Sequence, residues 1–192
     1  KQAFDVSSET DQLLDNSERA IFDITQKKFN TLSTKINEIL KETFTRIENL
    51  HDRQNRLTGL STGFYDLDDL TCGLQASELI IVAARPSMGK TSLALNIIEH
   101  VGVIDKKSAV LFSLEMSAQQ VAQNMLCSHA RIDAHKLRKG FLEDKQWSDL
   151  SYGMGSLSES PIFIDDTPGL TVLEVRAKAR RLKAQYNIQL VV

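Results

Sequence analysis

The stretch AARPSMGKTS, residues 83–92, holds residue types that bind phosphate groups. In the P-loop pattern G-x-x-x-x-G-K-[ST], backbone N–H groups cradle the phosphates, the lysine reaches the β- and γ-phosphates, and the hydroxyl binds Mg²⁺. Gly89, Lys90 and Thr91 fit this pattern, but Ala84 stands where its first glycine belongs. Alanine is compatible with the turn only at negative φ, because positive φ would cost about 1–2 kcal/mol.

The sequence around this motif favours a polyphosphate site. An apolar run precedes the motif and a helical pattern follows it, so the amides of Ser87 to Thr91 can point into one concavity at a helix N-terminus. The alternative is an ordinary strand-turn-helix with a surface lysine. The predicted binding residues are Ala84, Arg85, Pro86, Ser87, Met88, Gly89, Lys90, Thr91 and Ser92.

Carboxylates follow the next two apolar runs. Glu115 ends the run 109–115, and Asp165 and Asp166 end the run 161–166. At the carboxyl edge of a sheet, Glu115 can orient a water that attacks a γ-phosphate or accept its proton; the alternative is a solvated or helix-capping glutamate. Asp165 and Asp166 can help to hold Mg²⁺ or a water, but DDTPG is also good turn chemistry, and we favour the turn.

The elements that position these residues alternate along the chain. Strands are predicted at 78–84, 109–115, 161–166 and in the closing IQLVV, with helices at 91–101, 117–132 and 171–186. Strands this apolar must be buried on both faces, so we predict an α/β fold with a mainly parallel sheet. Ser117 with Gln120 and Thr171 with Glu174 form capping boxes. In the less clear segment 143–157, Trp147 and Leu150 are expected to pack in the core.

The first third of the chain reads differently. Residues 1–16 are polar, and two amphipathic helical patterns follow, over 17–29 and from Leu32 to Leu50. Their apolar stripes either pack on their own domain or dock on a partner subunit. The polar segment 51–59 ends in glycine, so we place a linker at 1–56 and the main domain at 57–192.

Composition excludes several classes. The 192 residues are 42% hydrophobic and 25% charged with a net charge of −2, so nothing global points to nucleic acid. Cys72 and Cys127 form no C-x-x-C pair, the histidines lack metal-ligand spacing, and the cations of 171–186 wrap a helix that we expect to be solvated. Without a membrane-length apolar run or a signal peptide, the chain is expected to be soluble and intracellular. It begins without Met and stops within an apolar run, which suggests a fragment.

Three stretches in order resemble the RecA-like motor domain of DnaB-type replicative DNA helicases. They are TGFYDLDDLTCGLQASELIIVAARPSMGKTSLALN, then LFSLEMS, then IFIDDTPGLTVLEVRAKARRL, and they place the resemblance over about residues 57–192. In that family alanine is an accepted opening residue of the loop. The resemblance implies a RecA-like P-loop NTPase, truncated here and preceded by a helical linker whose helix, at 17–29, docks on the next subunit.

The family's activity is what the resemblance implies for this chain. A hexameric ring would hydrolyse ATP with Mg²⁺ at subunit interfaces and move along single-stranded DNA at the replication fork. Lys90 would bind phosphate, Thr91 would bind Mg²⁺, and Glu115 would be the catalytic base. Primase and a helicase loader would be partners, with no membrane involved, in the bacterial cytoplasm or an organelle of bacterial origin.

The sequence also departs from the family or stops short of it. Asn124 stands where many members have an arginine near the nucleotide. The family's carboxylate that supports Mg²⁺, its arginine finger, its sensor glutamine and its DNA-binding loops would follow Val192. Two alternatives remain: a RecA-like recombinase or circadian-type ATPase, and a fragment that binds nucleotide and docks a subunit without turnover.

Overall fold

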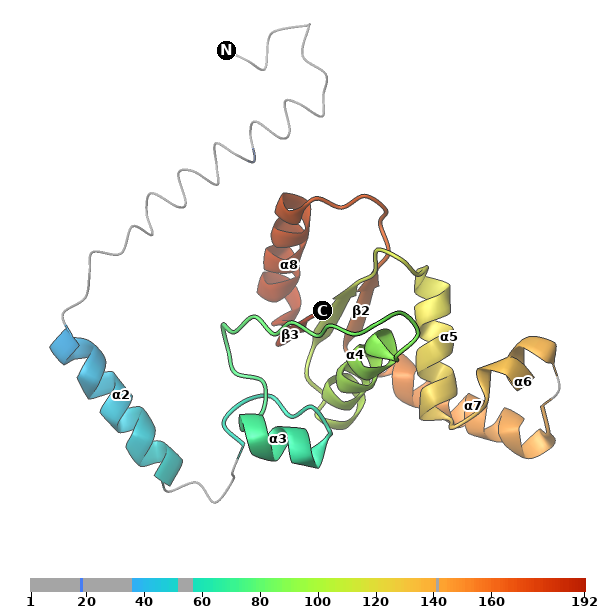
Figure 1. Cartoon of the computed structure of the whole chain (residues 1–192), viewed down its shortest axis with the longest axis horizontal. Coiled ribbons are helices and arrows are strands. Elements are labelled where there is room, and N and C mark those ends of the chain that lie inside the picture. The colour runs from blue at the N-terminus through green and yellow to red at the C-terminus, as the bar shows by residue number, and fades with distance from the viewer. Residues whose placement is uncertain (1–17, 19–35, 52–56, 141) are drawn as a thin grey trace, which may run out of the picture. The chain divides into compact units, whose positions relative to one another are not determined.

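Three parallel strands form the sheet of the larger of two units, Asn55–Val192. The central strand β1 (Ala109–Phe112) pairs with β2 (Ile162–Asp165) on one side and with β3 (Leu190–Val191) on the other (Figure 1). In register, Ala109 lies opposite Ile162 and Leu190. The structure, a computed structural model, describes residue 18 and residues 36–51, 57–140 and 142–192, which are meant below by the described residues.

Helices precede and follow each strand, as the alternating pattern predicts. Ser117 and Thr171 each cap their helix through the predicted box with Gln120 and Glu174, and Glu143 adds a third box at the start of α7. The helices of this unit within the described residues are α3 (Tyr65–Thr71), α4 (Lys90–Glu99), the π-helix η2 (His100–Ile104), α5 (Ala118–His129), α6 (Ala134–Lys139), α7 (Asp144–Ser158) and α8 (Val172–Tyr186).

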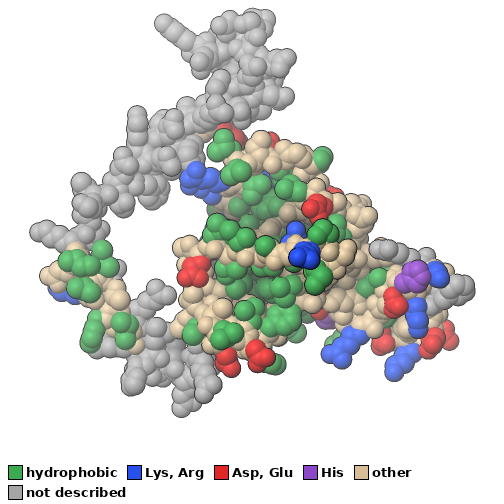
Figure 2. Space-filling model, in the orientation of Figure 1, with side chains coloured by type: hydrophobic (Ala, Val, Ile, Leu, Met, Phe, Trp, Pro, Cys, Tyr) green, Lys and Arg blue, Asp and Glu red, His purple; other side chains and the backbone are tan. Residues whose placement is uncertain are grey.

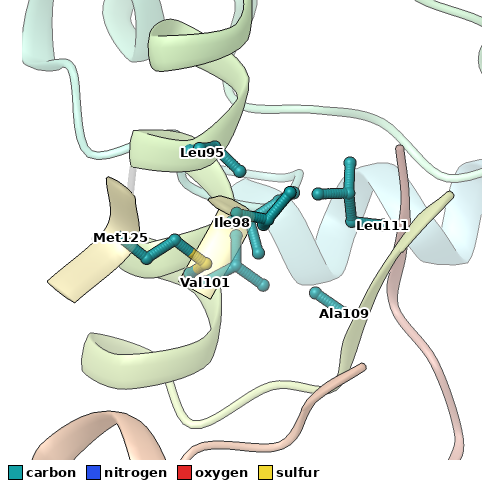
Figure 3. Close-up of a cluster of buried hydrophobic side chains, with 7 residues drawn as sticks. Leu95, Ile98, Val101, Ala109, Leu111 and Met125 are labelled. Atoms are coloured by element: carbon teal, nitrogen blue, oxygen red, sulfur yellow. The ribbon is translucent and has the colours of Figure 1, made fainter. Parts of the chain in front are cut away.

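Both faces of the sheet are covered, because successive side chains of a strand point to opposite faces. Ala109 and Leu111 of β1 pack in one cluster with Leu95 and Ile98 of α4, and that cluster also takes in Val101, Val121 and Met125 (Figure 3). On the other face, Phe163 of β2 contacts Tyr186 of α8, with ring centroids 4.5 Å apart. The sheet therefore lies between α4 and α5 on one face and α8 on the other, which confirms the predicted buried parallel sheet.

The predicted strand at 78–84 is wrong. These residues form no strand, and no backbone hydrogen bond joins 79–84 to another described segment. Leu79 and Ile81 are 87% and 80% exposed (Figure 2 shows the apolar side chains on this face). The run instead lines a cavity of about 610 Å³ whose opposite wall includes Leu190 and Val191 of β3. Apolarity predicts burial, but a strand also needs a bonded partner, and here the facing edge is only the two-residue β3.

The core position expected for Trp147 is also wrong. Its side chain is 56% exposed, whereas Leu150, predicted with it, is 6% exposed. Helix α7 meets α5 at Gly153, which lies against His129 and Leu126. Trp147 is six residues before Gly153, about 9 Å along the helix axis, and so lies away from that contact.

The smaller unit, Lys1–Gln54, contains α2 (Ile36–His51). The apolar stripe of α2 is exposed, with Ile36 at 69% and Phe44 at 64%. The predicted helix at 17–29 lies outside the described residues except for residue 18, as does the polar segment 52–56. Within the described part of the chain, no helix is both long and apolar enough to cross a membrane.

Candidate functional site

The predicted phosphate loop forms a tight turn that leads into α4. The amide of Met88 donates to the carbonyl of Arg85 at 3.3 Å, and the turn ends at Gly89, the N-cap of α4. Ser87 and Gly89 have φ of +64° and +84°, whereas Ala84 is not among the residues with positive φ. The condition for alanine at the first position of the loop is therefore met. Alternating backbone handedness of this kind turns successive N–H groups toward one concavity.

Helix α4 begins without a side-chain cap, unlike α5, α7 and α8. Its first backbone bond runs from the amide of Leu93 to the carbonyl of Gly89 at 2.9 Å. The amides of Lys90, Thr91 and Ser92 have no acceptor among the described residues. Unpaired amides at the positive end of a helix dipole are donors for an anion.

The side chains of the loop leave this site open. Residues 84–90 and Ser92 are exposed and Thr91 is half-buried, and a Cβ added at Gly89 would meet nothing within 4 Å. Among the described residues, no hydrogen bond or ion pair engages the ammonium of Lys90 or the hydroxyl of Thr91. The structure thus brings Lys90, Thr91 and three free amides together in one helical turn.

Glu115 lies in the five-residue connection from β1 to α5 and is exposed. Among the described residues, its carboxylate makes no hydrogen bond or ion pair, either to the phosphate loop or elsewhere. The hydroxyl of Ser113 closes this connection: it donates to the carbonyl of Met116 at 2.6 Å and accepts from the Met116 amide at 3.2 Å. Sequence reasoning did not identify Ser113, because a serine at a strand end carries no distinctive signal.

Asp165 and Asp166 form hydrogen bonds that make the turn interpretation the better one. One oxygen of Asp165 accepts from the amide and hydroxyl of Thr167, and the other accepts from Lys178 Nζ at 2.7 Å. The hydrogen bond from Lys178, followed by that from the Thr167 hydroxyl, lowers the pKa of Asp165 to about 2. Asp166 Oδ2 accepts from the amide of Ala118 at 2.7 Å.

A buried polar cluster anchors the residues that precede the loop. Asp68, 5% exposed, accepts from the hydroxyls of Ser61 and Thr62 and from the Thr62 amide. Burial raises the pKa of Asp68, but these hydrogen bonds outweigh it, and the net shift is downward. His100 of η2 lies 3.1 Å from the Ser61 hydroxyl through Nε2. The cluster therefore ties the segment before the loop to the end of α4.

This cluster is not a nucleophilic triad, although it contains serine, histidine and aspartate. Ser61 donates its hydroxyl hydrogen to Asp68 rather than to His100. Asp105 approaches the same Nε2 of His100, at 3.8 Å, instead of orienting the ring through the other nitrogen. The cluster serves packing, in agreement with the sequence, which offers no Ser-His-Asp argument.

A parallel α/β sheet followed at one helix by an uncapped G-K-T turn defines the class of P-loop nucleotide-binding proteins. Comparison with known proteins makes this more specific. The family model of the DnaB-like helicase C-terminal domain matches residues 59–192, and the chain belongs to that family. Membership makes the loop a nucleotide-binding loop, and it separates the chain from the recombinases considered as an alternative.

Similar proteins agree. The chain is 47% identical over 184 residues to "Replicative DNA helicase DnaB" of Geobacillus stearothermophilus and 45% identical over 183 residues to "Replicative DNA helicase DnaC" of Bacillus subtilis (strain 168). These alignments cover 96% and 95% of this chain but 40% of each relative. The chain therefore spans less than half of the relatives it matches.

Two solved structures share the fold. One is a separately solved ATPase domain, which superposes with a TM-score of 0.75 at 30% identity, covering 83% of this chain and 56% of that one. The other, "The Structure Of A DnaB-Like Replicative Helicase And Its Interactions With Primase", gives a TM-score of 0.71 at 26% identity, covering 94% and 45%.

Proposed function

We propose that this chain carries the nucleotide-binding part of an ATP-driven replicative DNA helicase that assembles as a hexameric ring and moves along single-stranded DNA. The single observation that supports this most is the uncapped first turn of α4 with Lys90 and Thr91 in it, in a chain of the DnaB-like helicase family. Three free amides, an ammonium and a hydroxyl match the phosphates of ATP, which carry several negative charges.

Each residue of the loop has a proposed role. The amides of Lys90, Thr91 and Ser92 bind phosphate oxygens, and the Lys90 ammonium neutralises the β- and γ-phosphates. Gly89 lets the backbone approach, because no Cβ stands between it and the ligand. Ala84, Arg85, Pro86, Ser87 and Met88 form the turn that aims these groups.

Mg²⁺ fits the donor set at this site. The described residues hold no group of three or more His, Cys, Asp or Glu side chains that could bind a metal. Mg²⁺ at nucleotide sites keeps several waters and few protein ligands, so the Thr91 hydroxyl beside the phosphates is sufficient from this chain. When bound, the ion would neutralise charge that develops on the phosphates.

Glu115 is proposed as the general base. Its carboxylate is exposed and has no partner among the described residues, so it is free to orient a water that attacks the γ-phosphate. A base with an ion-pair partner would be less available for this role. The absence of any contact between Glu115 and the loop means that nucleotide and water must bridge them.

The proposed partners extend beyond this chain. Identical subunits complete the ring, and the exposed stripe of α2 supports subunit docking by the linker. Single-stranded DNA, primase and a loader complete the proposal, which the solved helicase described with primase supports by analogy. The relatives come from bacteria, which supports the bacterial cytoplasm as the location.

The test is ATP hydrolysis by the full-length protein. Lys90→Ala should lower kcat by about 100-fold or more, because a preorganised charge at the phosphates is lost. Lys145→Ala, at an exposed lysine of α7, is the matched control and should leave kcat unchanged. Retained hydrolysis in Lys90→Ala would refute the phosphate-loop assignment.

A second variant tests the base. Glu115→Gln should keep nucleotide binding and lower kcat by about 100-fold or more, because the amide cannot accept the proton. Glu159→Gln, at an exposed glutamate after α7, is its control. Unchanged turnover in Glu115→Gln would rule out the base role, and no turnover in the unmutated protein would leave nucleotide binding and docking as the function.

A further inference from the structure

The connection that carries Glu115, residues 113–117, is tied to β2 at both of its ends. At the start, the amide of Ser113 donates to the carbonyl of Asp165 at 2.8 Å. Just past the end, the amide of Ala118 donates to Asp166 Oδ2 at 2.7 Å. Two consecutive residues of β2 and its following turn thus hold a connection that lies 48 residues earlier in the chain.

The bond from Ala118 to Asp166 is not ordinary helix capping. Helix α5 already has a complete capping box, in which Ser117 and Gln120 satisfy each other's amides. That box leaves the amide of Ala118 without a partner from its own helix, and a carboxylate from another element takes it. A negative charge at this helix N-terminus is also favourable for the dipole.

Asp166 is itself held in place by its neighbour. Both carboxylate oxygens of Asp165 are engaged, one by Thr167 and the other by Lys178. Asp165 therefore cannot replace Asp166 at the Ala118 amide without losing those bonds. The division of tasks between the two aspartates fixes where each carboxylate lies.

The side chain of Glu115 has no restraint of its own. Within residues 57–140 and 142–192 its carboxylate has no bonded partner, so its position depends on the backbone of residues 113–117. A general base must come within hydrogen-bond reach of the water it activates, and a misplacement of about 1 Å can cost about 100-fold in rate. The groups that fix this backbone therefore bear on catalysis.

We propose that Asp166 is a positioning residue for the hydrolytic reaction: by binding the Ala118 amide it fixes the connection that presents Glu115. The inference rests on the proposed role of Glu115 as general base. Asp166 does not contact the nucleotide in this proposal. Its removal lets the end of the connection move, so the base spends less time where the attacking water lies.

The first test measures ATPase kinetics of Asp166→Ala in the full-length protein. We expect kcat to fall about tenfold or more, with KM and the affinity for a non-hydrolysable ATP analogue within about twofold of wild type. Asp149→Ala, at an exposed aspartate of α7, is the control for loss of a surface charge. An unchanged kcat in Asp166→Ala, or an equal loss in Asp149→Ala, would overturn the proposal.

A second variant removes the same bond from the other side. Ala118→Pro deletes the donor N–H, and proline is tolerated at the first position of a helix. The preceding Ser117 is extended, with ψ of 156°, as a residue before proline requires. Ala118→Pro should reproduce the selective loss in kcat, and the double variant with Asp166→Ala should be no slower than either single one. Multiplied losses would show that the two residues act separately and would contradict the proposal.

A third comparison tests whether Asp166 acts through Glu115. In a Glu115→Gln background, Asp166→Ala should cause no further fall in kcat, whereas a purely structural defect would lower it again. Failure of this proposal is distinct from failure of the proposed function. If Lys90→Ala abolishes hydrolysis while Asp166→Ala and Ala118→Pro do not, the nucleotide site stands and the positioning role falls.

Discussion

At the scale of single residues, the backbone of the phosphate loop places its left-handed positions at Ser87 and Gly89. Left-handed backbone costs a residue with a Cβ about 1–2 kcal/mol, which glycine avoids. The requirement for glycine in this loop therefore falls on Gly89, and Ala84, outside the left-handed region, satisfies the turn as it stands. Ser87 adopts its conformation at a cost that the tight turn from Arg85 to Met88 imposes.

This predicts opposite outcomes for two exchanges of glycine and alanine. Gly89→Ala should lower the free energy of unfolding by about 1–2 kcal/mol and weaken binding of an ATP analogue. Ala84→Gly should cost about 0.4–1 kcal/mol through the entropy of the unfolded chain and leave nucleotide affinity unchanged. Denaturant unfolding and analogue titration measure both. Tighter nucleotide binding by Ala84→Gly would show that the first position also needs glycine.

At the scale of elements, an ion pair joins the end of β2 to α8. Lys178 Nζ lies 2.7 Å from Asp165 Oδ2, with the two side chains 27% and 21% exposed. Lys178 also donates to the hydroxyl of Thr167, which completes the turn after β2. Helix α8 buries no residue fully, so such polar contacts matter for how it sits on the sheet. The expectation that the cations of this helix are solvated is thus met only in part, because Lys178 is engaged with the turn.

The lowered pKa of Asp165 predicts a pH dependence of stability. The folded pKa of about 2 lies below the ordinary value of 3.8, so the contribution is complete above pH 3.8 and is lost as the pH falls through about 2. Asp165→Asn should lower the free energy of unfolding by about 1–2 kcal/mol at neutral pH, and the difference from wild type should shrink across that window.

Lys178→Met provides the matching change at the other partner. It should give a similar pH-dependent loss in denaturant unfolding, while Lys145→Met at an exposed lysine should not. A loss in Asp165→Asn that stays constant from neutral pH down to about pH 2 would show that the carboxylate stabilises the fold by packing rather than by charge.

At the scale of the whole molecule, a close approach of backbone and side chain sets the distance between η2 and the sheet. A Cβ added at Gly102 would overlap the side chain of Ile162 in β2. Gly155, in α7, has nothing within 4 Å of its virtual Cβ. The two glycines look alike in sequence, but only the first lies at an interface. Interiors are packed densely, so an added methyl group there must displace its neighbours.

These surroundings predict opposite signs for two alanine substitutions. Gly102→Ala should destabilise the domain by about 1–3 kcal/mol, because Ile162 must move. Gly155→Ala should stabilise it by about 0.5–1 kcal/mol, because alanine favours the helix and meets nothing. Thermal unfolding of the two variants measures the difference. Equal effects would show that the contact between η2 and β2 is loose.

The sequence by itself determined the class of fold and the phosphate loop. Local rules sufficed for these: apolar runs gave β1 and β2, capping boxes gave the starts of α5 and α8, and the G-K-T turn with its flanking elements gave the nucleotide site. The exposed run at 78–84 and the exposed Trp147 could not be predicted, because a strand needs a bonded partner and a buried side chain needs a facing helix. Only the tertiary structure decided that Asp166 binds Ala118 and that Gly102 meets Ile162. Each of these contacts joins residues about 50 to 60 positions apart, and no local pattern encodes a distance between segments that fold together.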